Sequence, residues 1–263
     1  MRLPTAYATY CSIRAELAAI IQKACPDLPL NKALISAIEG SIKVADAWAL
    51  AQILETYKPS TILEVGSFLG FSTRWLLEVG KSWGCRVTAV DPNVRHRIYD
   101  SPRRILEQLN ARFLGRELEV VTAFVGPPFP EKDLNWRYKA ESAANPDFMD
   151  DLLQSIPVVG ADWGRSFEAA FIDGQHHYDA VMRNYAVCAA LVEDSGVLTF
   201  HDPVTWPEVA QALSDIEAAN AGRRMEILNA SQVFSHPCLT REGIRTVDGI
   251  GVLYPAVRNP KAA

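Results

Sequence analysis

The sequence lacks long hydrophobic runs and paired cysteines, and both absences narrow the class of protein. No stretch approaches the roughly 20 apolar residues that a helix needs to cross a bilayer, and the N-terminus lacks a signal-peptide core. The five cysteines are dispersed and form no CxxC pair. This pattern fits neither a disulfide framework nor a thiolate zinc site. We therefore expect a cytoplasmic protein with reduced thiols and no membrane partner.

The chain also has no strong excess of positive charge. Its formal net charge is −5 at pH 7, and lysine and arginine never gather into a long basic run. A dedicated nucleic-acid surface is therefore disfavoured. We interpret the one basic concentration as a solvated face, with contact to an anionic substrate as the alternative; it comprises Arg95, Arg97, Arg103 and Arg104.

Apolar residues, in contrast, are plentiful enough for a large core. They make up 49% of the 263 residues, and a chain of this length buries roughly 70–75% of its unfolded surface. The length is compatible with one domain. We predict a single domain over residues 1–263, with N-terminal helices in residues 1–57 that are suited to a homodimer contact.

Short runs rich in Val, Ile, Leu and Phe alternate with helical patterns along the chain. This alternation predicts an α/β fold with a doubly wound, mostly parallel, seven-stranded sheet and helices on both faces. The expected strands are Thr61–Val65, Arg86–Val90, Glu119–Thr122, Ala169–Ile172, Gly196–His201, Met225–Leu228 and Gly249–Tyr254. The expected helices are Thr9–Lys23, Ser41–Thr56, Ser72–Val79, Arg103–Phe113, Tyr178–Leu191 and Pro207–Ala219.

One segment, residues 126–164, interrupts the alternation. It holds five prolines and two tryptophans and is longer than an ordinary connection. Long insertions in compact domains are usually lids or binding loops. We predict that this insertion is a lid over the substrate, with Trp136 and Tyr138 as an aromatic wall.

The segment Ile62–Leu77, ILEVGSFLGFSTRWLL, carries the clearest sign of a cofactor. An apolar strand contains Glu64, and Gly66 and Gly70 follow in a tight loop before a helix that begins near Ser72. Glycine lets the backbone approach a ligand closely, and the first helical turn offers N–H groups to an anion. The loop lacks the third glycine of a dinucleotide motif, so an amino-acid carboxylate fits better than a pyrophosphate.

A second acid, Asp91, ends the next strand, 25 residues after Gly66. At this position of a doubly wound sheet, a carboxylate can accept hydrogen bonds from the ribose hydroxyls of an adenosyl group. A glycine loop alone is equally compatible with a purely structural turn. The loop and the strand-end acid together indicate an adenosyl cofactor.

ILEVGSFLGFST followed by VTAVDPN resembles motifs I and II of the class I S-adenosylmethionine-dependent methyltransferases, especially the catechol and caffeoyl-CoA O-methyltransferase type. The resemblance extends over about Ile38–Pro203 and implies a Rossmann-like fold and S-adenosyl-L-methionine as cofactor. IEGS at Ile38–Ser41 resembles a short motif of that group beside the cofactor's amino-acid end. The predicted cofactor contacts are Glu39, Gly40, Glu64, Gly66, Ser67, Phe68, Gly70, Ser72, Asp91, Asp173, and Thr122 and Ala123 beside the adenine.

Ionisable residues follow two later strands. Asp173 ends one strand, with His176 and His177 close behind, and His201 and Asp202 end the next. The carboxyl ends of parallel strands face one crevice. Two carboxylates and an imidazole suit Mg²⁺ or another divalent cation, so Asp173, His201 and Asp202 form a predicted metal site. Such an ion would lower the pKa of a substrate hydroxyl.

The resemblance supports this placement of the metal ligands, but the sequence differs from the pattern of the group in two respects. The group carries one metal ligand where Asp173 stands and an adjacent pair where His201 and Asp202 stand, but that pair is usually Asp-Asn or Glu-Asp. His176 replaces the general-base lysine of the group. A histidine accepts a proton well near neutral pH, so His176 is the predicted base and His177 the second candidate.

Structural interpretations of the same residues stay open. Asp173 can cap the following helix, His177 can pack or hydrogen-bond, and the His201–Asp202 pair before a proline can close a turn. The predicted function is methyl transfer from S-adenosylmethionine to the hydroxyl of a small molecule, with help from a metal. The alternatives are N-methylation without a metal and a nucleotide-binding protein that does not methylate.

Overall fold

The computed structural model describes residues 1–96, 98–127, 138–237 and 247–256, and it is built on a seven-stranded sheet. The strand order is β3-β2-β1-β6-β7-β9-β8; the first five run parallel, and β9 is antiparallel to both neighbours. This confirms the predicted doubly wound α/β fold. The strands are β1 (Thr61–Val65), β2 (Arg86–Asp91), β3 (Leu118–Thr122), β6 (Phe167–Ile172), β7 (Val192–His201), β8 (Met225–Leu228) and β9 (Ile250–Leu253).

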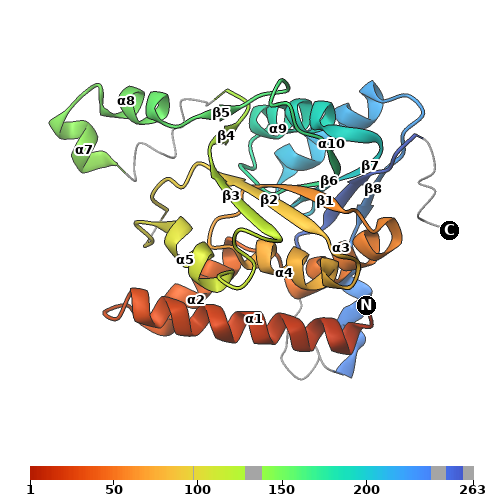
Figure 1. Cartoon of the computed structure of the whole chain (residues 1–263), viewed down its shortest axis with the longest axis horizontal. Coiled ribbons are helices and arrows are strands. Elements are labelled where there is room, and N and C mark those ends of the chain that lie inside the picture. Colours follow the sequence, from red (N-terminus) through yellow and green to blue (C-terminus); the bar gives the residue numbers. More distant parts are fainter. Residues whose placement is uncertain (97, 128–137, 238–246, 257–263) are drawn as a thin grey trace.

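Helices cover both faces of this sheet (Figure 1). On one face lie α3 (Val44–Tyr57), α4 (Phe71–Gly80) and α5 (Pro102–Leu109), and on the other lie α9 (Tyr178–Leu191) and α10 (Pro207–Ala219). Successive residues of a strand point to opposite faces. Ile62 accordingly packs in the cluster with α3, α4 and α5, while Leu63 packs in the cluster with α9 and α10. Burial on both faces explains why the strands are short apolar runs.

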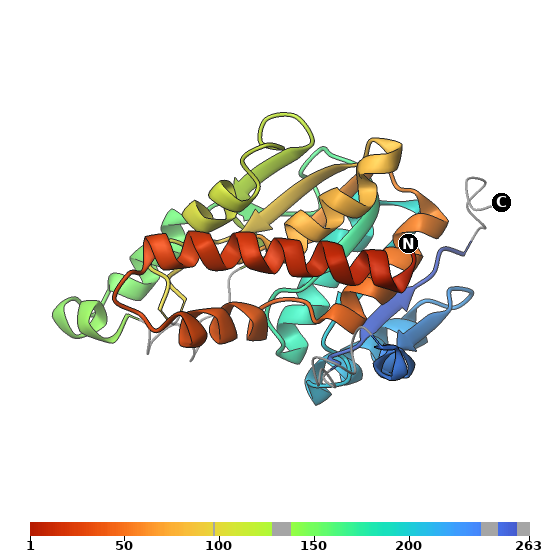
Figure 2. The same ribbon diagram turned by 90° about the horizontal axis from the view of Figure 1, so that it is seen from below.

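Two N-terminal helices add a further layer. Figure 2 shows α1 (Leu3–Ala24) lying across the helices of the first face, and α1 contacts α3, α4 and α5. Its buried residues are spaced three or four apart, which places them on one side of the helix: Ala6, Tyr10, Ile13, Leu17 and Ile21. The apolar face of α1 is therefore buried within its own chain. A homodimer stays a prediction, and α2 (Leu30–Glu39) was not predicted.

The insertion has secondary structure of its own. β4 (Phe124–Val125) pairs in parallel with β5 (Val158–Val159), and between them come α7 (Lys139–Ala144) and α8 (Phe148–Ser155), which stand out from the main sheet (Figure 1). The hydroxyl of Tyr138 is 2.7 Å from the Arg95 backbone N–H, from which it accepts a hydrogen bond. The insertion thus packs on the loop that follows β2. Trp136 lies outside the described residues.

The described residues also include the short 3-10 helices η1 (Lys81–Trp83) and η2 (Ala230–Ser235). Within the described residues, no helix combines the length and the hydropathy needed to cross a bilayer.

Candidate functional site

The loop between β1 and α4 approaches its neighbours so closely that two of its positions require glycine. Gly66 has φ of +86°, and a Cβ there would lie 2.1 Å from the Asp173 carbonyl oxygen. Gly70 has φ of +80°, and a Cβ there would lie 2.6 Å from Asn110 Nδ2. Any larger residue would push the loop away from β6 and α5. The loop is therefore fixed against the carboxyl end of the sheet.

Asp91, at the end of β2, points toward this loop. Its Oδ2 accepts a hydrogen bond from the Phe68 backbone N–H at 2.9 Å, and its Oδ1 accepts one from the Asn93 N–H at 2.7 Å. The structure thus brings Asp91 and the Gly66–Gly70 loop together. Ser67 of this loop lines the same pocket as Asp91, and its hydroxyl is buried and has no hydrogen-bond partner within the described part of the chain. A ligand at this edge would find an acceptor and a hydroxyl side by side.

Glu64 lies beneath the loop and faces α4. Its side chain is fully buried, and its two oxygens accept hydrogen bonds from the Ser72 hydroxyl at 2.6 Å and the Thr73 hydroxyl at 2.5 Å. Burial raises the pKa of Glu64 to about 8, and the two hydroxyl hydrogen bonds act in the opposite direction. Glu64 and Ser72 therefore contact each other and hold the first turn of α4.

A small pocket opens beside Asp91. It is lined by Ser67, Phe68, Asp91, Asn93, Arg103, Leu106, Val120 and Thr122. The Thr122 hydroxyl accepts a hydrogen bond from Arg103 at 2.6 Å, and Ala123 is buried next to it. A larger hollow of about 720 Å³ runs along the amino ends of the strands, away from every predicted site residue except the neighbourhood of Arg103. We therefore place the candidate cofactor site at the small pocket.

The end of α2 also reaches the loop. A Cβ on Gly40 would lie 2.8 Å from Phe68 Cε1, so the segment around Gly40 packs against the Phe68 ring. The ring also contacts His96, with centroids 4.3 Å apart. The side chain of Glu39 lies outside what the structure describes.

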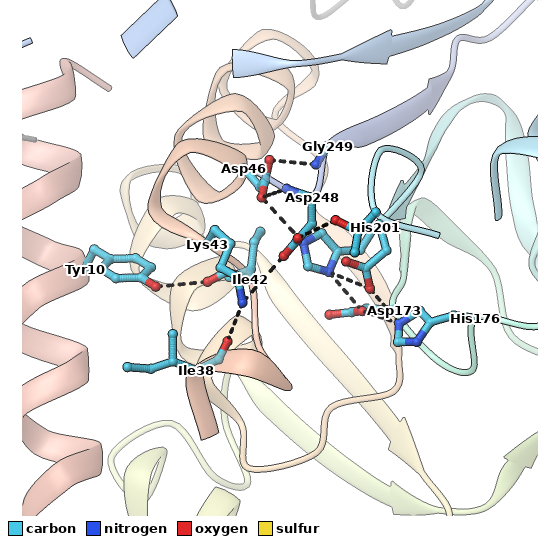
Figure 3. A network of polar contacts seen from close by, with 12 residues as sticks. Tyr10, Ile38, Ile42, Lys43, Asp46, Asp173, His176, His201, Asp248 and Gly249 are labelled. Carbon is cyan, nitrogen blue, oxygen red and sulfur yellow. Dashed lines mark hydrogen bonds and ion pairs between the residues drawn. The ribbon is translucent and has the colours of Figure 1, made fainter. Parts of the chain in front are cut away.

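The second group of predicted residues meets at the carboxyl ends of β6 and β7 (Figure 3). His201 Nδ1 lies 3.1 Å from Asp173 Oδ1 and 3.6 Å from Asp202 Oδ2. His176 Nε2 lies 2.6 Å from Asp202 Oδ2. The Asp173 backbone touches Gly66, so this cluster adjoins the glycine loop.

The charges in this cluster depend on one another. Burial lowers the pKa of His176, but the Asp173 and Asp202 carboxylates outweigh burial and raise it to about 9. Burial likewise opposes charge on His201, but the Asp173 carboxylate raises its pKa well above the ordinary value. Burial also raises the pKa of Asp173, yet the two imidazoles outweigh it and hold that pKa well below its usual range. Positive charge on this pair of histidines therefore balances the buried carboxylates.

The same cluster offers three candidate metal ligands that lie close together. One ligand atom from each of Asp173, His201 and Asp202 lies within 4.8 Å of the others. Two carboxylates and an imidazole are suitable donors for Mg²⁺ or Mn²⁺. The residues present therefore fit a divalent cation.

The structure gives a separate answer on the purely structural roles considered for Asp173, His177 and the His201–Asp202 pair. The N-cap of α9 is His177 and has no side-chain cap, so Asp173 does not cap this helix. His177 lies at the surface with its Nδ1 3.6 Å from Glu208 Oε1, outside the cluster. Asp202 has φ of +71°, and its carbonyl accepts a hydrogen bond from the Trp206 N–H. The His201–Asp202 pair therefore closes a turn and also contributes to the cluster.

Two residues of this region were not predicted. Trp206 stacks on His176 with ring centroids 4.9 Å apart and 11° between the planes, and it is 45% exposed. Asp46 on α3 is fully buried, with Oδ2 3.8 Å from His201 Nε2. A lone acid in the apolar stretch VADAWALAQIL was a signal for Asp46.

The comparisons with known proteins agree with this geometry. A family model described as a methyltransferase domain matches residues 63–203, which include the glycine loop, Asp91 and the cluster. A search of curated proteins gave no significant match.

Solved structures share the fold at low sequence identity. The O-methyltransferase TomG from Streptomyces achromogenes, in complex with SAM, is 12% identical, with 92% of this chain and 89% of TomG covered and a TM-score of 0.53. An O-methyltransferase from Bacillus cereus, in complex with SAH, is 15% identical, with coverage of 91% and 90% and a TM-score of 0.52. The SAH-bound methyltransferase PaMTH1 from Podospora anserina is 12% identical, with coverage of 91% and 87% and a TM-score of 0.50.

The family match spans more than half of the chain and contains the glycine loop, Asp91 and the Asp173 cluster. It agrees with the resemblance of the sequence to class I S-adenosylmethionine-dependent methyltransferases. The chain belongs to the methyltransferase-domain family.

Proposed function

We propose that this protein transfers the methyl group of S-adenosylmethionine to a hydroxyl oxygen of a small molecule. The observation that carries the proposal is the 2.9 Å hydrogen bond from the Phe68 N–H to Asp91, at the same sheet edge as the Asp173 cluster. This contact supports the proposal because Asp91, the glycine loop and the ionisable residues lie at one edge of the sheet. The O-methyltransferases of similar fold, one bound to SAM and one to SAH, support the cofactor and the acceptor class.

The cofactor is held by backbone and carboxylate groups. Asp91 accepts hydrogen bonds from the ribose hydroxyls, and the loop from Gly66 to Gly70 contacts the amino-acid end. Thr122 and Ala123 flank the adenine. Because Arg103 now donates to the Thr122 hydroxyl and borders the small pocket, it must give way for the adenine to enter.

The residues around Asp173 activate the hydroxyl group of the acceptor. His176 accepts the hydroxyl proton when its imidazole is neutral, and Asp202 Oδ2, 2.6 Å from Nε2, stabilises the imidazolium that results. Because Asp173 and Asp202 raise the pKa of His176 to about 9, proton transfer to this base should increase as the pH rises toward 9. Asp173, His201 and Asp202 would hold a divalent cation, which would lower the pKa of the hydroxyl. Alignment of the oxygen with the sulfonium methyl group contributes up to about 7–11 kcal/mol to lowering the barrier.

The first test is cofactor recognition. S-adenosylhomocysteine is expected to raise the melting temperature, whereas NAD is not, because the loop lacks the third glycine of a dinucleotide site. No stabilisation by S-adenosylhomocysteine would contradict the proposal. Product analysis with radiolabelled S-adenosylmethionine, a panel of phenols and amines, and Mg²⁺ or EDTA then decides the acceptor atom and the need for a cation. Methylated amines in EDTA would replace the O-methyl proposal with N-methylation.

A further inference from the structure

His201 lies between carboxylates that come from distant parts of the chain (Figure 3). Its Nδ1 faces Asp173 and Asp202, whereas its Nε2 faces Asp46 on α3, with 3.8 Å between Nε2 and Oδ2. The His201 side chain is 3% exposed, and Nε2 has no partner within hydrogen-bond distance among the described residues. A buried ring nitrogen without a partner is costly, and Asp46 offers an acceptor on that side.

Asp46 is itself held in place. Its Oδ2 accepts a hydrogen bond from the Asp248 N–H at 2.9 Å, and its Oδ1 accepts one from the Gly249 N–H at 3.0 Å. These two donors stabilise a carboxylate that has no exposure to water. Each carboxylate oxygen can accept a second hydrogen bond. Asp46 can therefore accept a proton donor from His201 without losing its anchor to the segment before β9.

We propose that Asp46 is a positioning residue that holds His201 through Nε2 and so directs Nδ1 at Asp173 and Asp202. This inference rests on the proposed function. A histidine that binds a cation through Nδ1 carries its proton on Nε2, and a carboxylate acceptor there fixes the tautomer and the ring orientation. The 3.8 Å separation is longer than a hydrogen bond, so this role requires the His201 ring to move toward Asp46. Asp46 lies outside the segment matched by the family model.

A rival arrangement places the cation on the other side of the ring. Ligand atoms of Asp46, His201 and Asp248 also lie within 4.8 Å of one another. One observation disfavours this site. The Lys43 ammonium lies 3.6 Å from Asp248 Oδ2, where it repels a second cation. The two arrangements make opposite predictions for Asp248.

The test compares Asp46→Asn with Asp248→Asn in the full-length protein. Both variants remove one negative charge from the same junction, but the ion pair with His201 Nε2, at 3.8 Å, is made by Asp46. We expect Asp46→Asn to weaken Mn²⁺ binding, measured by calorimetry without cofactor or acceptor, about 10–100-fold. Asp248→Asn keeps the backbone N–H that anchors Asp46 and changes side-chain contacts to Lys43 and Thr205, so it should stay within about threefold of wild type. Equal weakening in both variants, or unchanged affinity in Asp46→Asn, overturns the proposal.

A second measurement does not require a cation. In ¹⁵N-labelled, metal-free protein, the proton on His201 Nε2 should be visible and protected from exchange in wild type and in Asp248→Asn, and lost in Asp46→Asn. Absence of this proton in wild type overturns the proposal even if Asp46→Asn fails to fold. If wild type binds no Mn²⁺, the metal part of the proposed function fails and the Nε2 proton alone decides the role of Asp46. Stabilisation by S-adenosylhomocysteine tests the methyltransferase function separately.

Discussion

At the scale of single residues, two carboxyl groups at the same sheet edge have opposite electrostatic environments. Glu64 is buried against hydroxyl groups, and its pKa rises to about 8. Asp173 lies beside two imidazoles that hold its pKa well below the usual range. Hydroxyl donors do not compensate for the loss of hydration of a charge, whereas cationic neighbours do. At neutral pH, Asp173 is therefore ionised and Glu64 mostly protonated.

The Asp91 carboxylate is the residue whose loss should affect the cofactor most. Asp91→Ala removes both the acceptor for the ribose hydroxyls and the anchor of the Phe68 N–H. Hydrogen bonds to a charged group contribute about 1.5–3 kcal/mol each, so we expect roughly 100-fold weaker binding of S-adenosylhomocysteine. Calorimetry measures this loss, and Asp91→Asn, which keeps one acceptor, should show a smaller one. Wild-type affinity in Asp91→Ala would show that the ribose lies elsewhere.

Glu64 should make stability depend on pH. Its pKa is about 8 in the folded protein and 4.5 ordinarily, so its contribution is complete below pH 4.5 and is lost as pH rises through 8. The loss amounts to at most about 1.4 kcal/mol per pH unit. Glu64→Gln removes this titration, and its unfolding free energy relative to wild type should increase between pH 5 and pH 8. Urea denaturation at both pH values measures the change, and parallel pH dependences would contradict it.

At the scale of elements, local sequence patterns predicted helices well, whereas contacts between distant segments could not be predicted. The helices Tyr178–Leu191 and Pro207–Ala219 were predicted at their observed bounds, because apolar periodicity and a proline at the first turn are local signals. The pairing of β4 with β5 was missed, since two-residue strands carry no periodicity. Asp46 was missed because its partners Asp248 and Gly249 are about 200 residues away along the chain.

The same difference between local pattern and long-range contact applies to the site residues. Strand-end positions predicted the approach of Asp173, His201 and Asp202, since parallel strands end at one edge. The side chain of Glu64 points to α4, however, and His177 turns to Glu208. Strand alternation places Glu64 on the same face of β1 as Ile62, toward α4, whereas the contact of His177 with Glu208 depends on how α9 and α10 pack and does not follow from sequence spacing.

The turn after β7 carries a prediction about the acceptor. Trp206 stacks on His176 and remains 45% exposed, so it is placed to contact a molecule beside the base. We expect Trp206→Ala to lower kcat/KM for the acceptor about tenfold, the upper range for one aromatic contact. Binding of S-adenosylhomocysteine should not change. Val204→Ala is the matched control, because Val204 is equally exposed on the same turn. Loss of cofactor affinity in Trp206→Ala would assign Trp206 to the other substrate.

At the scale of the whole molecule, the N-terminal helices are part of the methyltransferase core, although they precede the matched segment. The Tyr10 hydroxyl donates to the Ile42 carbonyl, and the Trp75 indole of α4 donates to the Ala47 carbonyl of α3. The buried residues of α1 share one cluster with Ile62 of the central strand. Helices, sheet and site are therefore expected to unfold together.

Leu17→Ala tests this cooperativity. Leu17 lies on the buried face of α1, and truncation of a buried leucine to alanine costs about 2–5 kcal/mol. If α1 belongs to the common core, urea should unfold the variant in a single transition at lower concentration, with coincident curves from tryptophan fluorescence and far-UV circular dichroism. Ile35→Ala on α2 is the control, because Ile35 is 55% exposed and should change stability by less than about 0.5 kcal/mol. Separate transitions would instead show that α1 unfolds as an independent appendage, and binding of S-adenosylhomocysteine would then survive the first of them.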